Sequence, residues 1–344
     1  GLVVTGCGSN SSKADDSAKT DSGSKKEASA DGYQVVNIGF PSAGYEWAEG
    51  ALAVAEEKGY LDEYLNPLGY DADLIPFTGA APAIHEALVS GDLDYAYYAG
   101  FAGIMAKSNG IDTKLLAVTS FGSAWQLAVS ADSGITSLED LKGKTISYQR
   151  GATPQMYVLK VLEEAGLSTD DVQLVNSTIP EGLSSLSTGA VDAAVVTYGQ
   201  ADTLVEQGKA SIIHKGVDAD ADTFYEPSVL TGRTDFVEKN ADVSSAIIEA
   251  MLKARDDIIA DPEAFYELSS EKSGRTLEQV KSVAVSDVKL AYPVSLDERY
   301  ITSLKNIEQF ELDNDIITSQ VDFDSWIDSS YLDKAVQDYQ ENAE

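Results

Sequence analysis

Segments with the composition of buried β-strands alternate with helical segments along most of this chain. The predicted strands are residues 35–40, 71–77, 93–98, 113–120, 145–149, 172–175 and 191–196. Several intervening helices end at a glycine, as at Gly59 and Gly91, because glycine readily adopts the left-handed conformation that follows a helix. Strands that alternate with helices predict an α/β fold with a parallel sheet covered on both faces.

One order of residues occurs twice within this pattern. Residues 87–94 and residues 186–192 each contain the end of a helix, a glycine, one further residue, an aliphatic residue and an aspartate, before or at the start of a buried strand. Glycine alone is common in such loops. The shared order nevertheless favours two lobes of similar build.

We expect the chain to leave the first lobe near Ser123 and to return near Tyr225. The expected limits are residues 33–122 and 228–344 for lobe I, and residues 123–227 for lobe II. The chain reads as mostly helical from Ser228 onward, and we expect those helices to pack on lobe I. Two crossover segments make a hinge, so a ligand would lie in the cleft between the lobes.

The composition excludes several classes of partner. The 344 residues include 57 Asp and Glu but only 24 Lys and Arg, a formal net charge of −33. This balance argues against binding to nucleic acid or to anionic lipid surfaces. No apolar run approaches the roughly 18–20 residues that would span a bilayer. With one Cys and two His, the chain has neither a disulfide framework nor a Cys/His zinc site, and we expect no metal and no cofactor.

The first residues indicate where the protein is located. Residues 1–6 look like the end of a secretory signal, and the stretch that ends at Cys7 resembles a bacterial lipobox, which implies lipid attachment to Cys7. Residues 8–32 contain no Val, Ile, Leu, Met, Phe, Tyr or Trp, so residues 7–32 read as a lipidated cysteine and a disordered linker. The predicted location is extracytoplasmic, on the outer face of a bacterial cell membrane. The alternative is that Cys7 is an incidental thiol.

Several segments resemble the substrate-binding proteins of nitrate, sulfonate and taurine ABC importers. The matching segments are residues 77–84, 86–88, 91–94, 142–146, 150–153, 171–176 and 189–193. The resemblance covers about residues 35–230 and implies a periplasmic-binding-protein type II fold, with two βα lobes joined by two crossover segments. It also implies delivery of a small-molecule solute to an ABC permease and its ATPase, without catalysis; we expect a monomer. The chain departs from the family after the third strand, where Phe101 follows Gly100 instead of an aspartate.

In such folds the ligand binds beyond the carboxyl ends of the strands. Two loops there lead into helix N-termini, where free backbone N–H groups and the helix dipole favour an anion. These loops are Thr78, Gly79 and Ala80, and Arg150, Gly151, Ala152 and Thr153. Hydroxyls of Ser42, Thr78 and Thr153 would add donors, and Arg150 would pair with a sulfonate or carboxylate through two hydrogen bonds. The alternatives are a solvated Arg150 and simple N-capping by the two threonines.

The same loops carry aromatic and acidic residues that favour a different ligand. The set comprises Tyr45, Glu46, Trp47, Tyr98, Trp125, Tyr198 and Glu226, and Gly100 and Gln126 complete the candidate ligand-binding residues. Rings with carboxylates enclose a cation or sandwich a planar heterocycle. Each aromatic taken singly is more often part of a core or cleft wall, whereas several of them at predicted strand ends are a stronger signal for a ligand site. The net negative charge also steers a cationic or neutral ligand, although screening beyond about 8–10 Å leaves the local site to decide.

These observations favour a lipid-anchored solute-binding protein that captures a small organic anion of the sulfonate or taurine type. The alternative within the same fold is a pyrimidine-like heterocycle or an organic amine. An enzyme of pyrimidine or menaquinone-precursor synthesis that reuses the fold is less favoured, because no nucleophile motif accompanies His85 or His214. A surface lipoprotein with an adhesive or sensory role is the third class, and it would need no closed polar pocket.

Overall fold

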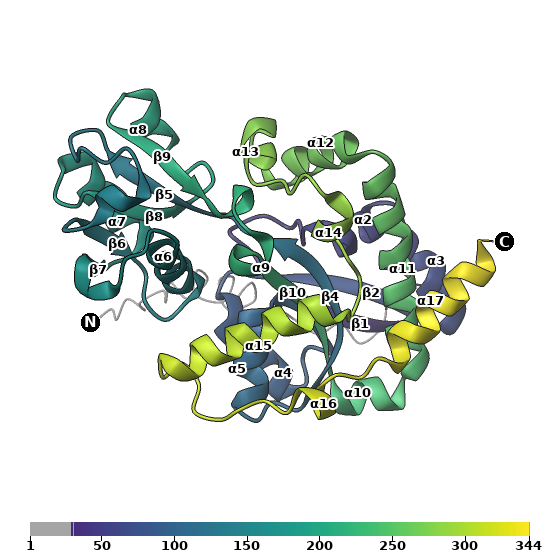
Figure 1. Cartoon of the computed structure of the whole chain (residues 1–344). Coiled ribbons are helices and arrows are strands. Elements are labelled where there is room, and N and C mark those ends of the chain that lie inside the picture. Colours follow the sequence, from purple (N-terminus) through teal and green to yellow (C-terminus); the bar gives the residue numbers. More distant parts are fainter. Residues whose placement is uncertain (1–28, 30, 344) are drawn as a thin grey trace, which may run out of the picture.

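The strands form two separate sheets, and the chain passes between them twice (Figure 1). The computed structural model describes residue 29 and residues 31–343. The first sheet contains β1 Gln34–Pro41, β2 Tyr70–Phe77, β3 Tyr95–Ala99, β4 Thr113–Gly122 and β10 Glu226–Arg233. The second contains β5 Trp125–Ser130, β6 Thr145–Tyr148, β7 Gln173–Asn176, β8 Ala193–Thr197 and β9 Ala210–Lys215. Among the described residues, the strand orders are β2–β1–β3–β10–β4 and β7–β6–β8–β5–β9.

We call the first sheet with its helices lobe I, and the second sheet with its helices lobe II. Lobe I carries α2 Gly50–Glu57, α3 Tyr60–Leu65, α4 Ala80–Ser90, α5 Gly100–Ser108, α10 Thr234–Lys239, α11 Ala241–Ala260, α12 Pro262–Ser273, α13 Leu277–Ser282, α14 Val288–Ala291, α15 Glu298–Asp313, α16 Phe323–Trp326 and α17 Ser330–Asn342. Lobe II carries α6 Thr153–Glu164, α7 Ile179–Thr188 and α8 Asp202–Glu206, and α9 Ala221–Phe224 lies on the second passage between the lobes. The residue limits expected for the two lobes remain a prediction.

Each sheet is mixed rather than wholly parallel, which corrects the sequence-based expectation. β1 pairs in parallel with β2 and β3, and β6 pairs in parallel with β7 and β8. In contrast, β10 runs antiparallel to β3 and β4, and β5 runs antiparallel to β8 and β9. Both exceptions enter their sheet from the other lobe. Their direction is therefore set by the crossover and not by a strand–helix–strand unit.

Strand β10 also corrects the expectation that the chain is mostly helical from Ser228 onward. The strand runs to Arg233 and lies between β3 and β4. Its residues Val229, Leu230 and Thr231 are fully buried. A short buried run of this kind has no periodicity that separates a strand from a helix, so the sequence pattern could not identify it.

The hydrophobic core of lobe I lies on both faces of its sheet. Val36, Ile38 and Phe40 on β1 are buried in a cluster with residues of α2 and α11, and Phe77 and Ile84 belong to the cluster on the other side. Helix α11 packs on α2, α3 and α17, while α15 packs on α5 and β10. The C-terminal helices thus complete lobe I around strands that come from both ends of the sequence (Figure 1).

The repeated order of residues forms the same structure in both lobes. Gly91 and Gly189 end α4 and α7 in the left-handed conformation, with φ of 83° and 78°. Three residues later, the carboxylate of Asp94 accepts a 2.9 Å hydrogen bond from the backbone N–H of Asn37 on β1. In lobe II, Asp192 accepts a 2.9 Å hydrogen bond from the backbone N–H of Thr145 on β6. Each aspartate therefore joins the end of a helix to the neighbouring parallel strand.

We predict that Asp94→Ala lowers the free energy of unfolding by about 2–4 kcal/mol, because it removes charge-assisted hydrogen bonds in a buried setting. Asp94 is 3% exposed and also pairs with Arg233 at 3.0 Å. The matched control is Asp92→Ala in the same loop, for which we expect a change within about 0.5 kcal/mol. Urea unfolding of both variants measures the difference, and equal effects would contradict this role for Asp94.

A second prediction concerns Glu311 on α15, which is fully buried and whose carboxyl oxygens have no hydrogen-bond partner among the described residues. Burial, with a smaller contribution from Glu308, raises its pKa to about 9. The folded state then retains a proton that the unfolded chain releases above about pH 4.3. Stability is therefore lost as the pH rises from there towards 9, by up to about 1.4 kcal/mol per pH unit from this group.

The variant Glu311→Gln has no titratable group at this position. We expect it to unfold at a higher temperature than the wild type at pH 8 and at a similar temperature at pH 4.5. Thermal unfolding followed across this pH range measures the effect. If the unfolding temperatures of the two proteins changed in parallel with pH, Glu311 would not be the group responsible for this pH dependence.

Candidate functional site

A cavity of about 340 Å³ opens at the carboxyl ends of β1 and β3, beside the strands that lead to lobe II. It is lined by Pro41, Ala48, Glu49, Gly50, Tyr97, Tyr98, Ala99, Ser120, Ser228 and Tyr292. An adjoining hollow of about 250 Å³ shares Ala99, Ser120, Ser228 and Tyr292 with the cavity. Its other walls include Gly122, Ser123, Ala124 and Glu226, where the two crossovers leave lobe I. This is the position at which open α/β sheets bind ligands.

The backbone at Glu49 and Gly50 has an uncommon conformation. Both residues have positive φ, 69° at the N-cap Glu49 and 61° at Gly50, the first residue of α2. The carbonyl of Glu49 accepts a 2.9 Å hydrogen bond from the hydroxyl of Tyr97, and a Cβ on Gly50 would lie 2.7 Å from that same hydroxyl oxygen. A positive φ at a residue with a side chain costs free energy and is concentrated at functional sites. Here it places the Glu49 side chain at the cavity.

Arg275, in the loop between α12 and α13, connects the two lobes next to this cavity. It does not line the cavity itself, but it pairs with the lining residue Glu49. Its Nη1 donates to Glu49 Oε1 at 2.9 Å, and its Nη2 donates to the hydroxyl of Tyr45. The guanidinium carbon also lies 4.4 Å from the centre of the Tyr198 ring, which follows β8 of lobe II. Arg275 therefore contacts lobe I through an ion pair and lobe II through a cation–π interaction.

The electrostatics of this group follow from partial burial. Burial raises the pKa of the Glu49 carboxyl, and the nearby Arg275 opposes that rise. Burial likewise raises the pKa of the Tyr45 and Tyr198 hydroxyls. Both tyrosines stay neutral near pH 7, so their rings can face the guanidinium without a competing phenolate charge. The site thus combines one carboxyl, one guanidinium and several neutral phenols.

Further polar contacts join the lobes on either side of the cavity. Gln279 on α13 donates from Nε2 to Asp202 Oδ2 on α8 at 3.1 Å. On the opposite side, Gln155 on α6 donates to Asn314 at 3.3 Å, just after α15. The first contact is exposed and the second is partly buried, and polar contacts that water can reach are easily exchanged for hydration. They are compatible with two lobes that separate and close.

The structure brings several of the predicted residues to this region. Tyr98 lines the cavity, Glu226 lines the adjoining hollow, and Tyr45 and Tyr198 flank Arg275. In lobe II, the indole N–H of Trp125 donates to Thr153 Oγ1 at 3.0 Å, so these two residues also meet.

Other predicted residues are placed elsewhere or are engaged in local structure. Ser42 uses its hydroxyl to bind the backbone N–H groups of Gly44 and Tyr45, each at 3.1 Å. Trp47 is buried while Glu46 is exposed. Thr78, Gly79 and Ala80 are exposed at the start of α4. Gly100 faces protein rather than the cavity, because a Cβ there would lie 2.4 Å from Leu304. Gln126 is buried and lines a separate hollow of about 250 Å³ against α13.

The loop that contains Arg150 lies outside both linings. The Arg150 side chain is exposed and forms no ion pair within the described residues; its backbone N–H donates to Asn176 Oδ1 at 2.9 Å. Gly151 has φ of 82° and donates to Gln155 Oε1 at 2.8 Å, and extended Ala152 precedes the first turn of α6. A ligand contact at this loop remains a prediction.

Sequence reasoning missed Glu49, Gly50, Tyr97, Tyr292 and above all Arg275. Arg275 comes from a helical region that carried no recognisable motif, and its partners are more than 70 residues away in the chain. The available signal was an arginine directly after Gly274, which has φ of 74° and ends α12. That signal marks a loop, but it does not show which surface the loop faces.

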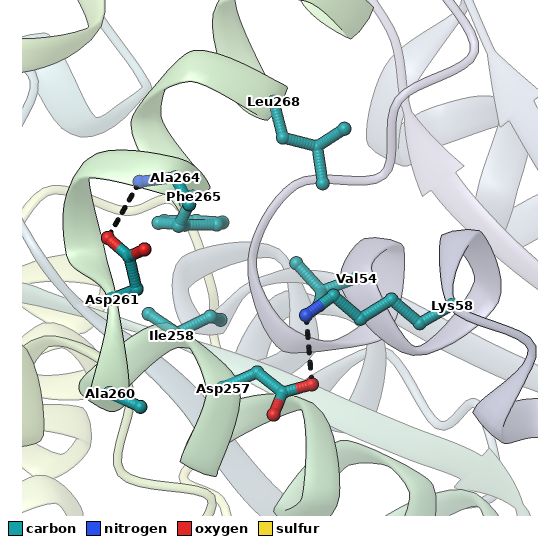
Figure 2. A pocket seen from close by; sticks show the side chains of 9 residues that line it. All are labelled: Val54, Lys58, Asp257, Ile258, Ala260, Asp261, Ala264, Phe265 and Leu268. Atoms are coloured by element: carbon teal, nitrogen blue, oxygen red, sulfur yellow. Dashed lines mark hydrogen bonds and ion pairs between the residues drawn. The ribbon is translucent and has the colours of Figure 1, made fainter.

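A further hollow, of about 260 Å³, lies on lobe I among α2, α11 and α12 (Figure 2). Val54, Ile258, Phe265 and Leu268 supply its apolar walls, and at its rim Lys58 pairs with Asp257 at 2.9 Å. It contains no residue of lobe II and none of the predicted ligand-binding residues.

Within residues 31–343, no group of three or more His, Cys, Asp and Glu side chains is arranged to hold a metal ion. No described helix is both long and apolar enough to cross a membrane. The predicted lipid attachment at Cys7 and the signal remnant at residues 1–6 lie outside the described residues, as does most of the linker at 7–32.

Solved structures identify the class of fold. The periplasmic sulfonate-binding protein SsuA from Methylobacillus flagellatus KT matches with a TM-score of 0.77 and 21% identity, over 90% of this chain and 95% of that chain. The desulfurization enzyme DSZB matches with a TM-score of 0.69 and 18% identity, over 89% and 99% of the two chains. The chain has the periplasmic-binding-protein type II fold, as the resemblance implied.

The family follows from the sequence. The family model described as "NMT1/THI5 like" matches residues 49–265, which is more than half of the chain, and the chain belongs to this family. A Bacillus subtilis (strain 168) relative, named "Putative aliphatic sulfonates-binding protein", is 23% identical over 342 residues, covering 98% of this chain and 95% of the relative.

We predict that Arg275→Ala loosens the contact between the lobes, because it removes both the ion pair to Glu49 and the cation–π contact to Tyr198. The radius of gyration measured by small-angle X-ray scattering without solute should increase. The matched control is Lys272→Ala at the end of α12, where a partly exposed ion pair to Glu57 at 3.2 Å is lost within lobe I. An unchanged radius for Arg275→Ala, or an equal increase in the control, would contradict the bridging role.

Proposed function

We propose that this chain is the solute-binding component of an ABC importer, which holds a small organic solute between its lobes and releases it unaltered. The observation that carries the proposal is the cavity at the crossovers, whose lining residue Glu49 pairs with Arg275, which in turn contacts Tyr198 of lobe II. Contact between lobes at the cavity lets a solute bias their closure, because any group that binds both lobes favours the closed state. The binding-protein relatives support the same conclusion.

We further propose that the solute is a small organic anion of the sulfonate or taurine type. Arg275 supplies a guanidinium, which pairs well with such groups. Ser120 and Ser228 line the cavity, and Ala99 at its wall is the residue before α5, whose first turn presents backbone N–H groups. Neither arginine lines the cavity, but Arg275 pairs with the lining residue Glu49, so we assign to Arg275 the cationic role that the sequence suggested for Arg150. The names of the sulfonate-binding relatives support this solute class.

A second candidate within the same fold is a pyrimidine-like heterocycle or an organic amine. The observation that favours it is the lining itself, in which the Glu49 carboxyl stands among the rings of Tyr97, Tyr98 and Tyr292. Carboxylates with aromatic faces bind cations and planar rings. This candidate requires Arg275 to remain paired with Glu49 when the solute binds.

We propose binding without catalysis, although DSZB shows that the fold also serves an enzyme. The cavity lining contains no Cys or His, and the single Cys of the sequence is Cys7. An acyl- or group-transfer mechanism usually needs such a nucleophile or base at the site. Turnover of any bound compound would revive the enzyme hypothesis.

The location and partners are part of the same proposal. We place the protein on the outer face of a bacterial cell membrane, held by lipid on Cys7 and the linker at residues 7–32, as a monomer that delivers its solute to a permease and its ATPase. Labelling with a radioactive fatty acid in a bacterial host would test the anchor, with Cys7→Ser as the control. Label retained in that variant would contradict lipid attachment at Cys7.

The solute class is tested by thermal unfolding with a panel of ethanesulfonate, taurine, nitrate, a pyrimidine and putrescine. We expect sulfonates to stabilise the wild type by about 2–3 kcal/mol at a hundredfold excess over the dissociation constant. Arg275→Ala should lose this stabilisation, whereas Arg150→Ala should retain most of it. Stabilisation by the pyrimidine or putrescine alone would favour the second candidate, and no stabilisation by any small solute would contradict the proposed function.

A further inference from the structure

The hollow next to the cavity contains a carboxyl group that the binding of an anion does not explain. Glu226 is the first residue of β10 and pairs in register with Gly122 of β4, so it lies where both crossovers leave lobe I. Glu226 and Gly122 both line this hollow, which we call the hinge chamber. A Cβ on Gly122 would lie 3.2 Å from Val285 Cγ2, so the missing side chain helps to keep the space beside the carboxyl open.

The charge of Glu226 is not compensated by a contact. Within the described part of the chain, its carboxyl forms no hydrogen bond and no ion pair, although it is only partly exposed. Burial raises its pKa to about 8, and the charge of Lys160 on α6 opposes this rise. Burial lowers the pKa of Lys160 in turn, while Glu226 and Glu163 act against that shift. The carboxyl is therefore largely protonated near pH 7 in the free protein, and a bound cationic donor would stabilise its ionised form.

The chamber also has the surroundings that a protonated amine requires. Tyr292 belongs to the walls of both the cavity and the hinge chamber, and an aromatic face attracts an ammonium group. Ser120 and Ser123 add hydroxyl acceptors to the same walls. In contrast, the carboxyl at the cavity, Glu49, already has Arg275 as a partner at 2.9 Å. Glu49 is thus paired with a cation of the protein, whereas Glu226 has no contact partner. Only Glu226 is therefore available to a cationic group of the ligand.

We infer that the hinge chamber is a subsite for a cationic amine, with Glu226 as its specificity-determining residue, and that the solute is a zwitterion. Its ammonium group binds Glu226 beside Tyr292, and its anionic group lies towards Arg275 in the adjoining cavity. The inference rests on the proposed solute-binding function and narrows its ligand class. It explains how one site combines a guanidinium with a second, unpaired carboxyl.

The test uses two solutes that differ only in the group inferred to meet Glu226. Taurine carries an ammonium group where isethionate carries a hydroxyl, and both end in the same sulfonate. Isothermal titration of the wild type should give at least tenfold tighter binding of taurine. Glu226→Gln should weaken taurine until the two solutes bind within about twofold, while the affinity for isethionate, which reports an intact site, stays unchanged. Glu86→Gln, an exposed carboxyl on α4, is the matched control and should behave like the wild type.

A second variant removes the charge of Lys160, which acts on Glu226 electrostatically and not through a contact. Lys160→Gln should move the preference for taurine to higher pH, because without the charge of Lys160 the pKa of Glu226 rises further and the carboxylate that binds the ammonium group forms at higher pH. The inference is overturned if the wild type binds both solutes alike, if Glu226→Gln weakens both equally, or if the preference survives in that variant.

The proposed function can fail separately. If neither sulfonate binds, the anionic part of the proposal is wrong, and ethanolamine and putrescine then decide the subsite. If either amine binds the wild type but not Glu226→Gln, the cationic subsite at Glu226 is supported. If neither amine shows this difference, the subsite is overturned.

Discussion

The insertion of β10 between β3 and β4 is the constraint on which the rest of this structure depends. Because β10 is hydrogen-bonded on both sides, the strand that returns from lobe II is held in the middle of the lobe I sheet. Its neighbour β4 is the strand that leaves for lobe II, so both connections start side by side. Two adjacent connections define a single hinge line between the lobes. The same arrangement places Glu226 and Gly122 opposite each other and creates the space beside the hinge.

The charge distribution makes the site different from the rest of the surface. The formal net charge is −33, yet next to the cavity a guanidinium is held by two tyrosine rings and by the carboxylate of the lining residue Glu49. Cation–π contacts and a partly buried ion pair hold Arg275 in place with little dependence on long-range charge, since exposed charges are screened beyond about 8–10 Å. An overall acidic protein can therefore hold an anionic group locally. The same reasoning makes the unpaired Glu226 informative, because its partner has to come from the solute.

Regular and local features of the fold could be predicted from the sequence. The glycine–aspartate order predicted two lobes of similar build, and the structure gives its physical reason: Asp94 and Asp192 each bind the backbone N–H of an adjacent strand. The loop from Arg150 to Thr153 was predicted to lead into a helix, and α6 begins at Thr153. These features depend on residues close in sequence or on a repeated pattern.

The parts that could not be predicted depend on contacts between distant segments. Arg275 meets Glu49 and Tyr198 only after α12 has packed on lobe I and the lobes have come together. The positive φ of Glu49 is set by its bond to Tyr97, and no local pattern indicates it. Arg150 was the natural candidate for the cation because its loop precedes a helix, whereas the structure leaves its side chain in water.

Hydrogen–deuterium exchange with and without a saturating solute tests the central claim, capture between two lobes, most directly. Solute should slow exchange together in the loop at residues 41–50, in the segment 274–279 of lobe I and in the segment 198–202 of lobe II. Protection limited to one lobe, or centred on the hollow among α2, α11 and α12 in Figure 2, would contradict it.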